Sequence, residues 1–298
     1  MNIDFTLCKF SDLVTILQEH GYLFQTFSDF IKAPKNKTVV MRHDVDRLPL
    51  NALKMAEMEH ELGMVATYYF RAVPVSFDRN VMEEIAGMGH EIGYHYENAD
   101  AVSKGGRKRS DFSEGGERSD LSEGVTGEGG SDNAPESVAH SSVTTPDLLD
   151  LAYEDFCENL ARFREYFEIK TICMHGSPLS KYDNRMIWER YDYKQLGIVA
   201  EPYFDVDFND VFYLTDTGRR WNNATSSVRD RVESGFDIPV RNTAHLIEML
   251  RANRLPDKIM FNVHPQRWHD RPLPWLKELV GQNLKNVVKR HLVKRKQV

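Results

Sequence analysis

The sequence predicts an α/β protein built on a parallel sheet, either closed or open. Short apolar runs rich in β-branched residues alternate along the chain with longer segments whose apolar residues recur at helical spacing. Histidine and aspartate residues directly follow several of these runs, where the loops of a parallel sheet carry chemistry. At 298 residues and 41% hydrophobic composition the chain can bury a sizeable core, so we expect one domain over residues 1–298.

The first predicted unit is strand–helix–strand. Residues 38–41 form an apolar, β-branched run, residues 49–62 have apolar side chains at helical spacing, and residues 65–70 are again strand-like. The later predicted elements, in order, are a helix over 80–88, a strand at 91–93, a helix over 148–167, strands at 171–174, 198–200 and 211–214, a helix over 243–251 and a strand at 258–263.

The segment 100–147 differs in composition from the rest of the chain. It holds eight of the eighteen glycines, nine serines and one aromatic residue, Phe112. Such a segment buries too little apolar area to offset the entropy of ordering it. We therefore predict a disordered low-complexity insertion.

Charge and composition exclude several classes of protein. A net charge of −7 argues against non-specific binding to nucleic acid. The one feature that favours binding to an anionic partner is a basic tail at 285–298. Apolar residues lie between its charges or just before them, at Leu284, Val287, Val288 and Leu292. This pattern favours a terminal amphipathic helix with a solvated face over a membrane anchor. No stretch approaches about 18 apolar residues, so no membrane span is predicted. Three cysteines without metal-type spacing and an amino-terminus unlike an export signal favour the cytoplasm.

Four predicted strand ends supply metal ligands. Asp44 and Asp46 follow the run at 38–41 and are separated by one residue, Val45. In an extended chain their side chains therefore project to the same side. There one carboxylate can bind a metal while the other accepts a proton. His95, His175 and His264 lie at the ends of other apolar or glycine-punctuated runs. Taken together, these residues predict one site for a divalent metal.

The same residues resemble a known family. Asp44, the strand at 66–70, the Gly-His-Glu-Ile-Gly-Tyr-His phrase at 89–95 and the late strand that ends in His264 are similar to the polysaccharide deacetylases, the NodB-homology group of carbohydrate esterase family 4. The similarity runs from about residue 38 to residue 268, interrupted by the insertion. It implies a distorted (β/α) barrel of about seven strands, similar to a TIM barrel, and a divalent metal, commonly zinc, bound by one aspartate and two histidines.

The resemblance also implies roles for individual residues. Asp44 matches the catalytic base and His264 the general acid. Asp46 is the counterpart of the metal-binding aspartate, but the family has its two aspartates adjacent whereas Val45 intervenes here, which leaves the two roles interchangeable. His95 matches the first metal-binding histidine.

The third metal ligand stays open. The family places its second histidine four residues after the first, where this chain has Ala99. The first choice is His175, followed by His43 or Glu97.

The mechanism expected of such a site is metal-assisted hydrolysis. A metal lowers the pKa of bound water and polarises a carbonyl oxygen, so that a nearby carboxylate completes the deprotonation. A backbone N–H in the turn at Gly176 would help to hold the oxyanion, and His264 would protonate the departing amine. Tyr96, Trp221 and Trp268 could stack on a sugar ring, and Arg219 could bind a phosphate or uronate, although packing or a surface ion pair is the commoner fate of such residues.

The function predicted is removal of an acetyl group from an N-acetylated sugar or glycoconjugate, such as a soluble sugar conjugate or a lipid-linked intermediate. Two alternatives remain: a metal-dependent hydrolase of another C–N bond in a small amide, and a catalytically degenerate carbohydrate-binding protein. The metal hypothesis depends on whether His175 or His43 approaches Asp46 and His95.

Overall fold

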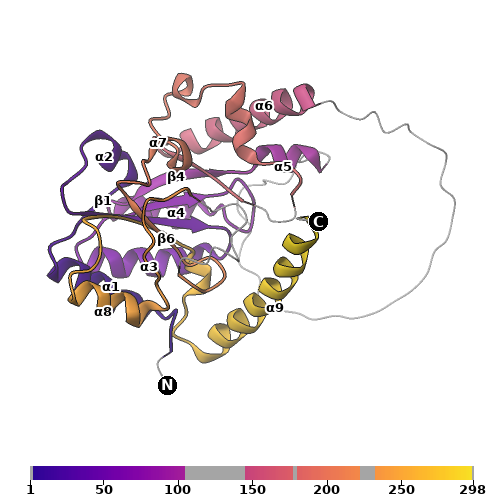
Figure 1. The fold of residues 1–298 in the computed structure, drawn as a ribbon. Helices are drawn as coiled ribbons and strands as arrows, with labels where there is room; N and C mark the ends of the chain where they lie inside the picture. The colour runs from indigo at the N-terminus through magenta and orange to yellow at the C-terminus, as the bar shows by residue number, and fades with distance from the viewer. Residues whose placement is uncertain (1–2, 105–144, 177–179, 222–231, 297–298) are drawn as a thin grey trace.

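A computed structural model describes residues 3–104, 145–176, 180–221 and 232–296 (Figure 1). Its centre is a seven-stranded, fully parallel sheet that curls into a half-barrel, which confirms the predicted fold class of a distorted (β/α) barrel. The order is β5-β4-β3-β2-β7-β6, and β1 also pairs with β2. The strands are β1 (Leu23–Gln25), β2 (Thr38–Val45), β3 (Thr67–Phe70), β4 (Glu91–Tyr96), β5 (Ile172–Met174), β6 (Phe212–Thr215) and β7 (Lys258–Val263).

Strand β2 is the middle of the sheet. One edge of β2 pairs with β1 along residues 38–40 and with β3 along residues 42–45, while the other edge pairs with β7 along residues 38–43. All eight of its residues are buried. Backbone hydrogen bonds to the neighbouring strands on both edges therefore fix the position of the polar residues at the carboxyl end of β2. This makes β2 a rigid support for a site.

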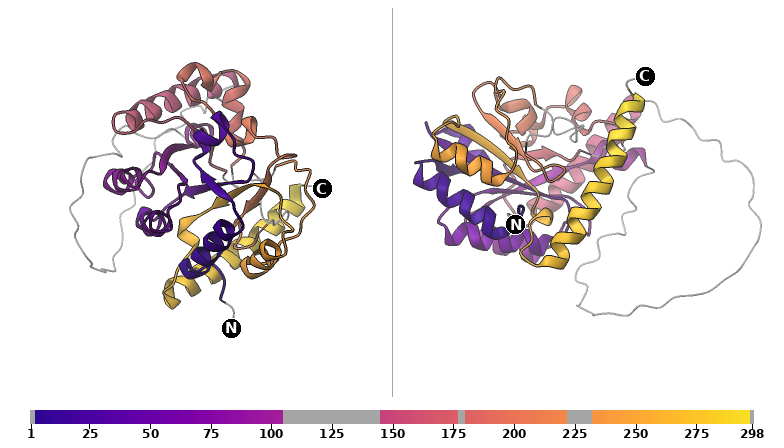
Figure 2. Two further views of the ribbon diagram at one scale, coloured as in Figure 1. Left: turned by 90° about the vertical axis from the view of Figure 1, so that its left-hand side faces the viewer. Right: turned by 60° about the horizontal axis from the view of Figure 1, so that its bottom comes forward.

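Helices cover the outer face of the sheet (Figure 2). The α-helices are α1 (Leu7–Glu19), α2 (Phe27–Lys32), α3 (Pro49–Glu61), α4 (Arg79–Gly87), α5 (Asn98–Ser103), α6 (Thr145–Arg164), α7 (Pro202–Asp205), α8 (Thr243–Arg251) and α9 (Pro272–Lys296). Three 3₁₀ helices are η1 (Asn184–Glu189), η2 (Tyr193–Leu196) and η3 (Pro265–Arg267).

The core has two parts because side chains of a strand alternate between the faces of the sheet. Val39 and Met41 of β2 belong to the large cluster between the sheet and its helices, whereas Val40 belongs to a smaller cluster inside the curl. Phe27 and Phe30 of α2 join this inner cluster.

Helix α2 closes the amino end of the curl. Its first backbone N–H groups donate to side chains at the starts of β3 and β4: Phe27 N to Thr67 Oγ1 at 2.8 Å, and Ser28 N to Glu91 Oε2 at 2.9 Å. The carboxyl ends of the strands lie at the opposite end, where the predicted site residues are found.

The structure confirms most of the predicted elements and corrects two predictions. Residues 198–200 do not form a strand, since the only pairing among the described residues there is a single bridge between Ala200 and Thr171. Helix α7 begins at Pro202, so the chain turns away before a ladder can form. Helices α5 and α6 occupy the two ends of the segment predicted to be disordered, and residues 105–144 of that prediction lie outside the described residues.

Candidate metal and catalytic site

Strand alternation places Asp44 inside the curl. Val40, Arg42 and Asp44 share the inner face of β2, while His43 and Val45 point outward. Asp46 follows the end of the strand and lies on the same side as Asp44, as predicted: both carboxylates are within 4 Å of His95 Nε2, at 3.8 Å for Asp44 and 3.6 Å for Asp46.

Three side chains meet at this end of the sheet. His175 follows β5, and its backbone N–H donates to Tyr96 O of β4 at 2.8 Å, which holds it beside His95. His175 Nδ1 lies 3.2 Å from Asp46 Oδ1 and 3.2 Å from His95 Nε2. With 3.6 Å between His95 Nε2 and Asp46 Oδ1, the three atoms form a nearly equilateral triangle.

The size of this triangle suits a small divalent cation. Zinc binds histidine nitrogen and carboxylate oxygen at about 2.0–2.2 Å in tetrahedral geometry, which separates neighbouring ligand atoms by about 3.3–3.5 Å. Two imidazole nitrogens and one carboxylate oxygen are also the ligand set of open zinc sites. Asp46, His95 and His175 therefore fit such an ion in both geometry and chemistry.

Hydrogen bonds orient these ligand atoms. His95 Nδ1 lies 2.9 Å from the carbonyl oxygen of Cys173, so Nδ1 carries the proton and Nε2 offers its lone pair to the triangle. Gln266 Nε2 donates to Asp46 Oδ2 at 2.9 Å, which leaves Oδ1 for the ligand position. Burial alone would raise the pKa of Asp46, but His175 and His95 outweigh it and hold this pKa well below its usual value.

Asp44 has the environment of a general base. Arg42 Nη2 donates to its Oδ2 at 3.2 Å and also to Tyr203 Oη at 3.3 Å, whereas Oδ1 is buried without a hydrogen-bond partner in the described part of the chain. Burial would raise the pKa of Asp44, but the charges of Arg42 and His95 lower it. The carboxylate thus stays ionised, with one oxygen free to accept a proton.

His264 and Asp216 form the other side of the site. His264 Nδ1 lies 2.7 Å from Asp216 Oδ1, and His264 Nε2 faces Asp46 Oδ2 at 4.0 Å. Arg267 Nη1 and Trp268 Nε1 also donate to Asp216, at 2.6 and 2.8 Å. Burial would raise the pKa of Asp216, but Arg267 and His264 lower it to about 2. Asp216 is therefore a fixed anion that turns Nε2 of His264 toward the triangle.

Sequence reasoning missed Asp216, Arg42 and Tyr203. Asp216 had a usable signal, because it follows the predicted strand at 211–214 as directly as the other site residues follow theirs. Arg42 was missed because its sequence position argues against a place inside the sheet: arginine is rare in a buried strand unless it is paired with an acid. Neither alternative for the third ligand joins the triangle. His43 Nε2 pairs with Glu59 Oε1 at 2.7 Å on the outer face. Glu97 borders the site, with Oε2 3.9 Å from His175 Nε2, but the same oxygen pairs with Arg71 Nη2 at 2.6 Å.

The predicted sugar-binding residues do not fit their positions. Trp221 and Trp268 are each 2% exposed and pack against each other, and Tyr96 is fully buried between Phe156 and Trp188. Stacking on a sugar needs an open ring face, so these three predictions are corrected: the rings belong to the core. Arg219 is 7% exposed and donates to the carbonyl oxygen of Arg267, which does not suit a substrate anion.

Gly176 directly follows His175, at the rim of the site. Ser177, the second residue of the turn predicted to hold the oxyanion, lies outside the described residues.

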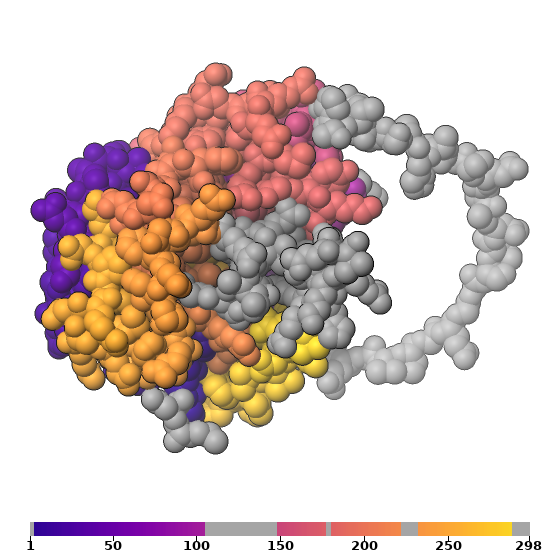
Figure 3. Space-filling model, in the orientation of Figure 1, coloured from indigo at the N-terminus to yellow at the C-terminus, as the bar shows by residue number. Residues whose placement is uncertain are grey.

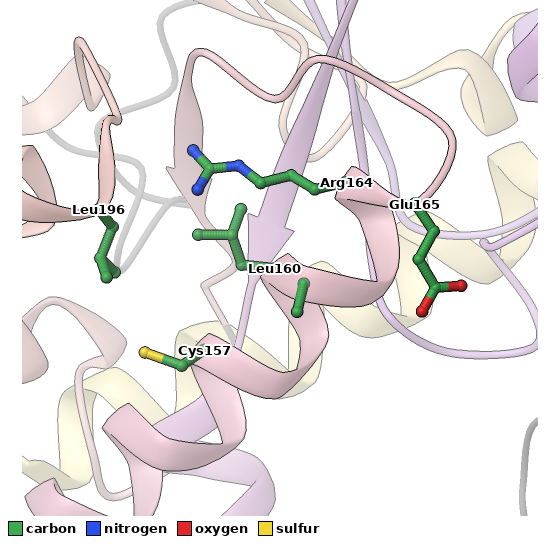
Figure 4. Close-up of a pocket in the computed structure, with 6 residues that line it drawn as sticks. Cys157, Leu160, Arg164, Glu165 and Leu196 are labelled. Atoms are coloured by element: carbon green, nitrogen blue, oxygen red, sulfur yellow. The ribbon is translucent and has the colours of Figure 1, made fainter.

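A separate apolar pocket lies beside α6, and none of its lining residues belongs to the site (Figure 4). Its volume is about 420 Å³, and it is lined mainly by one face of α6, including Cys157, Leu160 and Arg164, with Leu196 opposite. No candidate metal-binding group of the described residues includes any of its lining residues, so we assign it no part in the chemistry.

No protein-family model matches the chain, and no curated protein matches it. Among solved structures, the chain is similar to one described as a Streptococcus mutans CE4 esterase, at 12% sequence identity and a TM-score of 0.37, over 93% of this chain and 91% of that chain. At this level the similarity carries no argument about function. The functional conclusion therefore depends on the geometry of the site.

Glu201 is a buried acid on the interior side of the site. It is fully buried and accepts hydrogen bonds from the backbone N–H groups of Met174, at 3.0 Å, and Tyr203, at 2.6 Å. Burial raises its pKa to about 7, although these hydrogen bonds act in the opposite direction. Because Tyr203 accepts a hydrogen bond from Arg42, Glu201 also supports the environment of Asp44.

This pKa predicts a dependence of stability on pH. Because the folded pKa of about 7 exceeds the ordinary value of 4.5, the protonated form of Glu201 favours folding, and its contribution is lost as the pH rises through 7. The loss should amount to about 2.5 kcal/mol between pH 5 and pH 8. We expect the free energy of unfolding of Glu201→Gln, measured in urea, to fall less than that of the wild type over this range. Equal falls in both proteins would contradict the assignment.

Proposed function

We propose that this protein is a metal-dependent hydrolase that removes an acetyl group from an N-acetylated sugar or glycoconjugate. The observation that carries the proposal is the triangle of Asp46 Oδ1, His95 Nε2 and His175 Nδ1, with sides of 3.2, 3.2 and 3.6 Å. These residues would hold a divalent cation, with zinc the best match to the ligand set. When bound, such a cation supplies Lewis-acid polarisation of a carbonyl oxygen and lowers the pKa of water.

The remaining chemistry belongs to residues around the triangle. Asp44 Oδ1 accepts the proton of the attacking water, since Arg42 keeps the carboxylate ionised and occupies only Oδ2. His264 delivers a proton from Nε2 to the departing amine while Asp216 holds its Nδ1–H. A base 3.8 Å from His95 and an acid 4.0 Å from Asp46 both border the ligand triangle, which is the arrangement that amide hydrolysis needs.

The choice of substrate depends on the resemblance of the sequence to the deacetylases. It draws no support from aromatic stacking, because Tyr96, Trp221 and Trp268 are buried. A hydrolase of another C–N bond in a small amide needs the same base, acid and ligand set. Only analysis of the reaction products can therefore distinguish a deacetylase from such a hydrolase.

The test is a product assay on metal-depleted protein. After chelation, zinc is restored and acetate release is measured from N-acetylated amino sugars and their oligomers. We expect acetate with zinc and none without it. Release of a different acid or of ammonia from other amides, without acetate, would point to the alternative hydrolase. Sugar binding that is independent of metal, with no product, would point to a carbohydrate-binding protein; either result overturns the proposal.

A further inference from the structure

Helix α9 carries an exposed row of aliphatic side chains. Leu273, Leu276, Val280, Leu284 and Val287 are each between 50% and 81% exposed. Their spacing of three or four residues places them in one stripe along the helix. We call these five residues the α9 stripe. In the space-filling view, α9 is yellow and forms part of the surface at the lower right of the molecule (Figure 3).

The other side of α9 contacts the body of the protein through polar groups. Glu278 Oε2 pairs with Arg47 Nη2 at 2.7 Å, and Asn286 Nδ2 donates to the carbonyl oxygen of Gly218 at 3.0 Å. Gln282 and Asn286 are buried there and hydrogen bonded to each other. Trp275 and Leu279 are half-buried, and Trp275 Nε1 donates to the carbonyl oxygen of Asp4 at 2.7 Å. The helix thus leaves most of its aliphatic side chains exposed, whereas an ordinary surface helix buries its apolar face. Lys285 is exposed, in line with the predicted solvated face, but Leu284 and Val287 are exposed as well.

Charge indicates what covers the stripe. From residue 272 to the end of the sequence there are seven basic residues and one acidic residue, Glu278, in a chain with a net charge of −7. Lys277 and Lys285 are exposed on α9 alongside the stripe. Exposed aliphatic residues flanked by lysine and arginine are typical of helices that lie in the plane of an anionic bilayer surface.

A second copy of the chain matches the stripe less well. In a two-fold dimer the same patch meets itself, so two strongly basic helices would be brought together. Helix pairs of this kind are usually stabilised by acidic residues opposite basic ones beside the apolar seam. Beside the α9 stripe the described chain offers Lys277 and Lys285 but no exposed acid on the helix.

We propose that α9 docks this protein on an anionic lipid surface, with the α9 stripe in the apolar boundary and the basic residues against the headgroups. The helix would lie on the bilayer, since no described helix is long and apolar enough to cross one. Arg47 adjoins Asp46, and Gly218 lies two residues after Asp216, so α9 lies at the same end of the sheet as the candidate site. The inference depends on α9 alone and not on the proposed function.

The test is sedimentation of the full chain with vesicles, without substrate or metal. We expect binding to vesicles of mixed phosphatidylglycerol and phosphatidylcholine at least about tenfold tighter than to phosphatidylcholine alone, and weaker as salt increases. The double variant Leu276→Glu/Leu284→Glu should lose at least about tenfold in binding. Both side chains are at least half exposed, so folding should be retained. Leu151→Glu on α6, where Leu151 is 44% exposed, is the matched control and should bind like the wild type.

Two outcomes overturn the proposal. One is absence of binding to anionic vesicles, or binding that the double variant retains. The other is a wild-type dimer, seen by light scattering, that the double variant converts to a monomer while neither protein binds vesicles; a second copy would then cover the stripe.

Discussion

Replacement of His95 by alanine is expected to remove the metal and the activity together. His95 Nε2 is one of the three proposed ligand atoms, and no other imidazole among the described residues takes its place in the triangle. Loss of an outer hydrogen-bonding partner of a metal ligand costs about 10–100-fold in affinity, so loss of the ligand itself should cost more than about 100-fold. The measurement is bound zinc by elemental analysis, together with the affinity from competition with a chelator.

The matched control is His60→Ala on α3. This histidine is exposed and its Nδ1 lies near the carbonyl oxygen of Met88, far from any metal ligand. It should keep both the metal and the activity. A His95→Ala protein that binds zinc as tightly as the wild type would refute the assigned site, and absence of zinc from both proteins after reconstitution would refute the hydrolase.

Asp44→Asn and Asp46→Asn are expected to have different effects, because the first removes the proposed base and the second a proposed metal ligand. Asp44→Asn should keep the metal, because Asp46, His95 and His175 remain, but lose about 10²–10⁴-fold in turnover with the base. Asp46→Asn should lose the metal as well. Metal content and acetate release are measured on both variants side by side.

The stability of the two variants has to be measured before their activities are compared. Asp44→Asn leaves Arg42 as a buried cation without its carboxylate, which should destabilise the protein by about 3–5 kcal/mol. Activity is therefore compared below the unfolding temperature of the weaker variant. If Asp44→Asn lost the metal and Asp46→Asn kept it, the roles of the two aspartates would be exchanged.

The sequence predicts which side chains converge at the strand ends, for a physical reason. Parallel strands bring their carboxyl ends to one edge, so Asp46, His95 and His175 converge although each is far from the others in the chain. The side-chain period of two likewise places Asp44 and Asp46 together. These inferences need only local pattern and one general rule of topology.

What could not be predicted depends on contacts in three dimensions. Nothing in the sequence around Trp221 or Trp268 distinguishes a ring that lines a site from one that packs against Phe5. The apolar spacing of α1 was readable, at Phe10, Leu13, Val14 and Leu17, but β1 has only three residues and a polar end, too little for a strand signal. The outward direction of the α9 stripe depends on which face the body of the protein binds.

The proposed metal ligands come from three strand ends, and this origin implies an order of assembly. His95 and His175 are 80 residues apart, and the unfolded chain holds no short histidine pair at this site that could chelate a metal by itself. In the deacetylases that the sequence resembles, the two metal-binding histidines are four residues apart. Such a pair would allow a chain to capture the ion before it has folded. At the proposed site the β4–β5 pairing would have to form first, so metal loading would follow folding, and a bound ion would stabilise only the folded state.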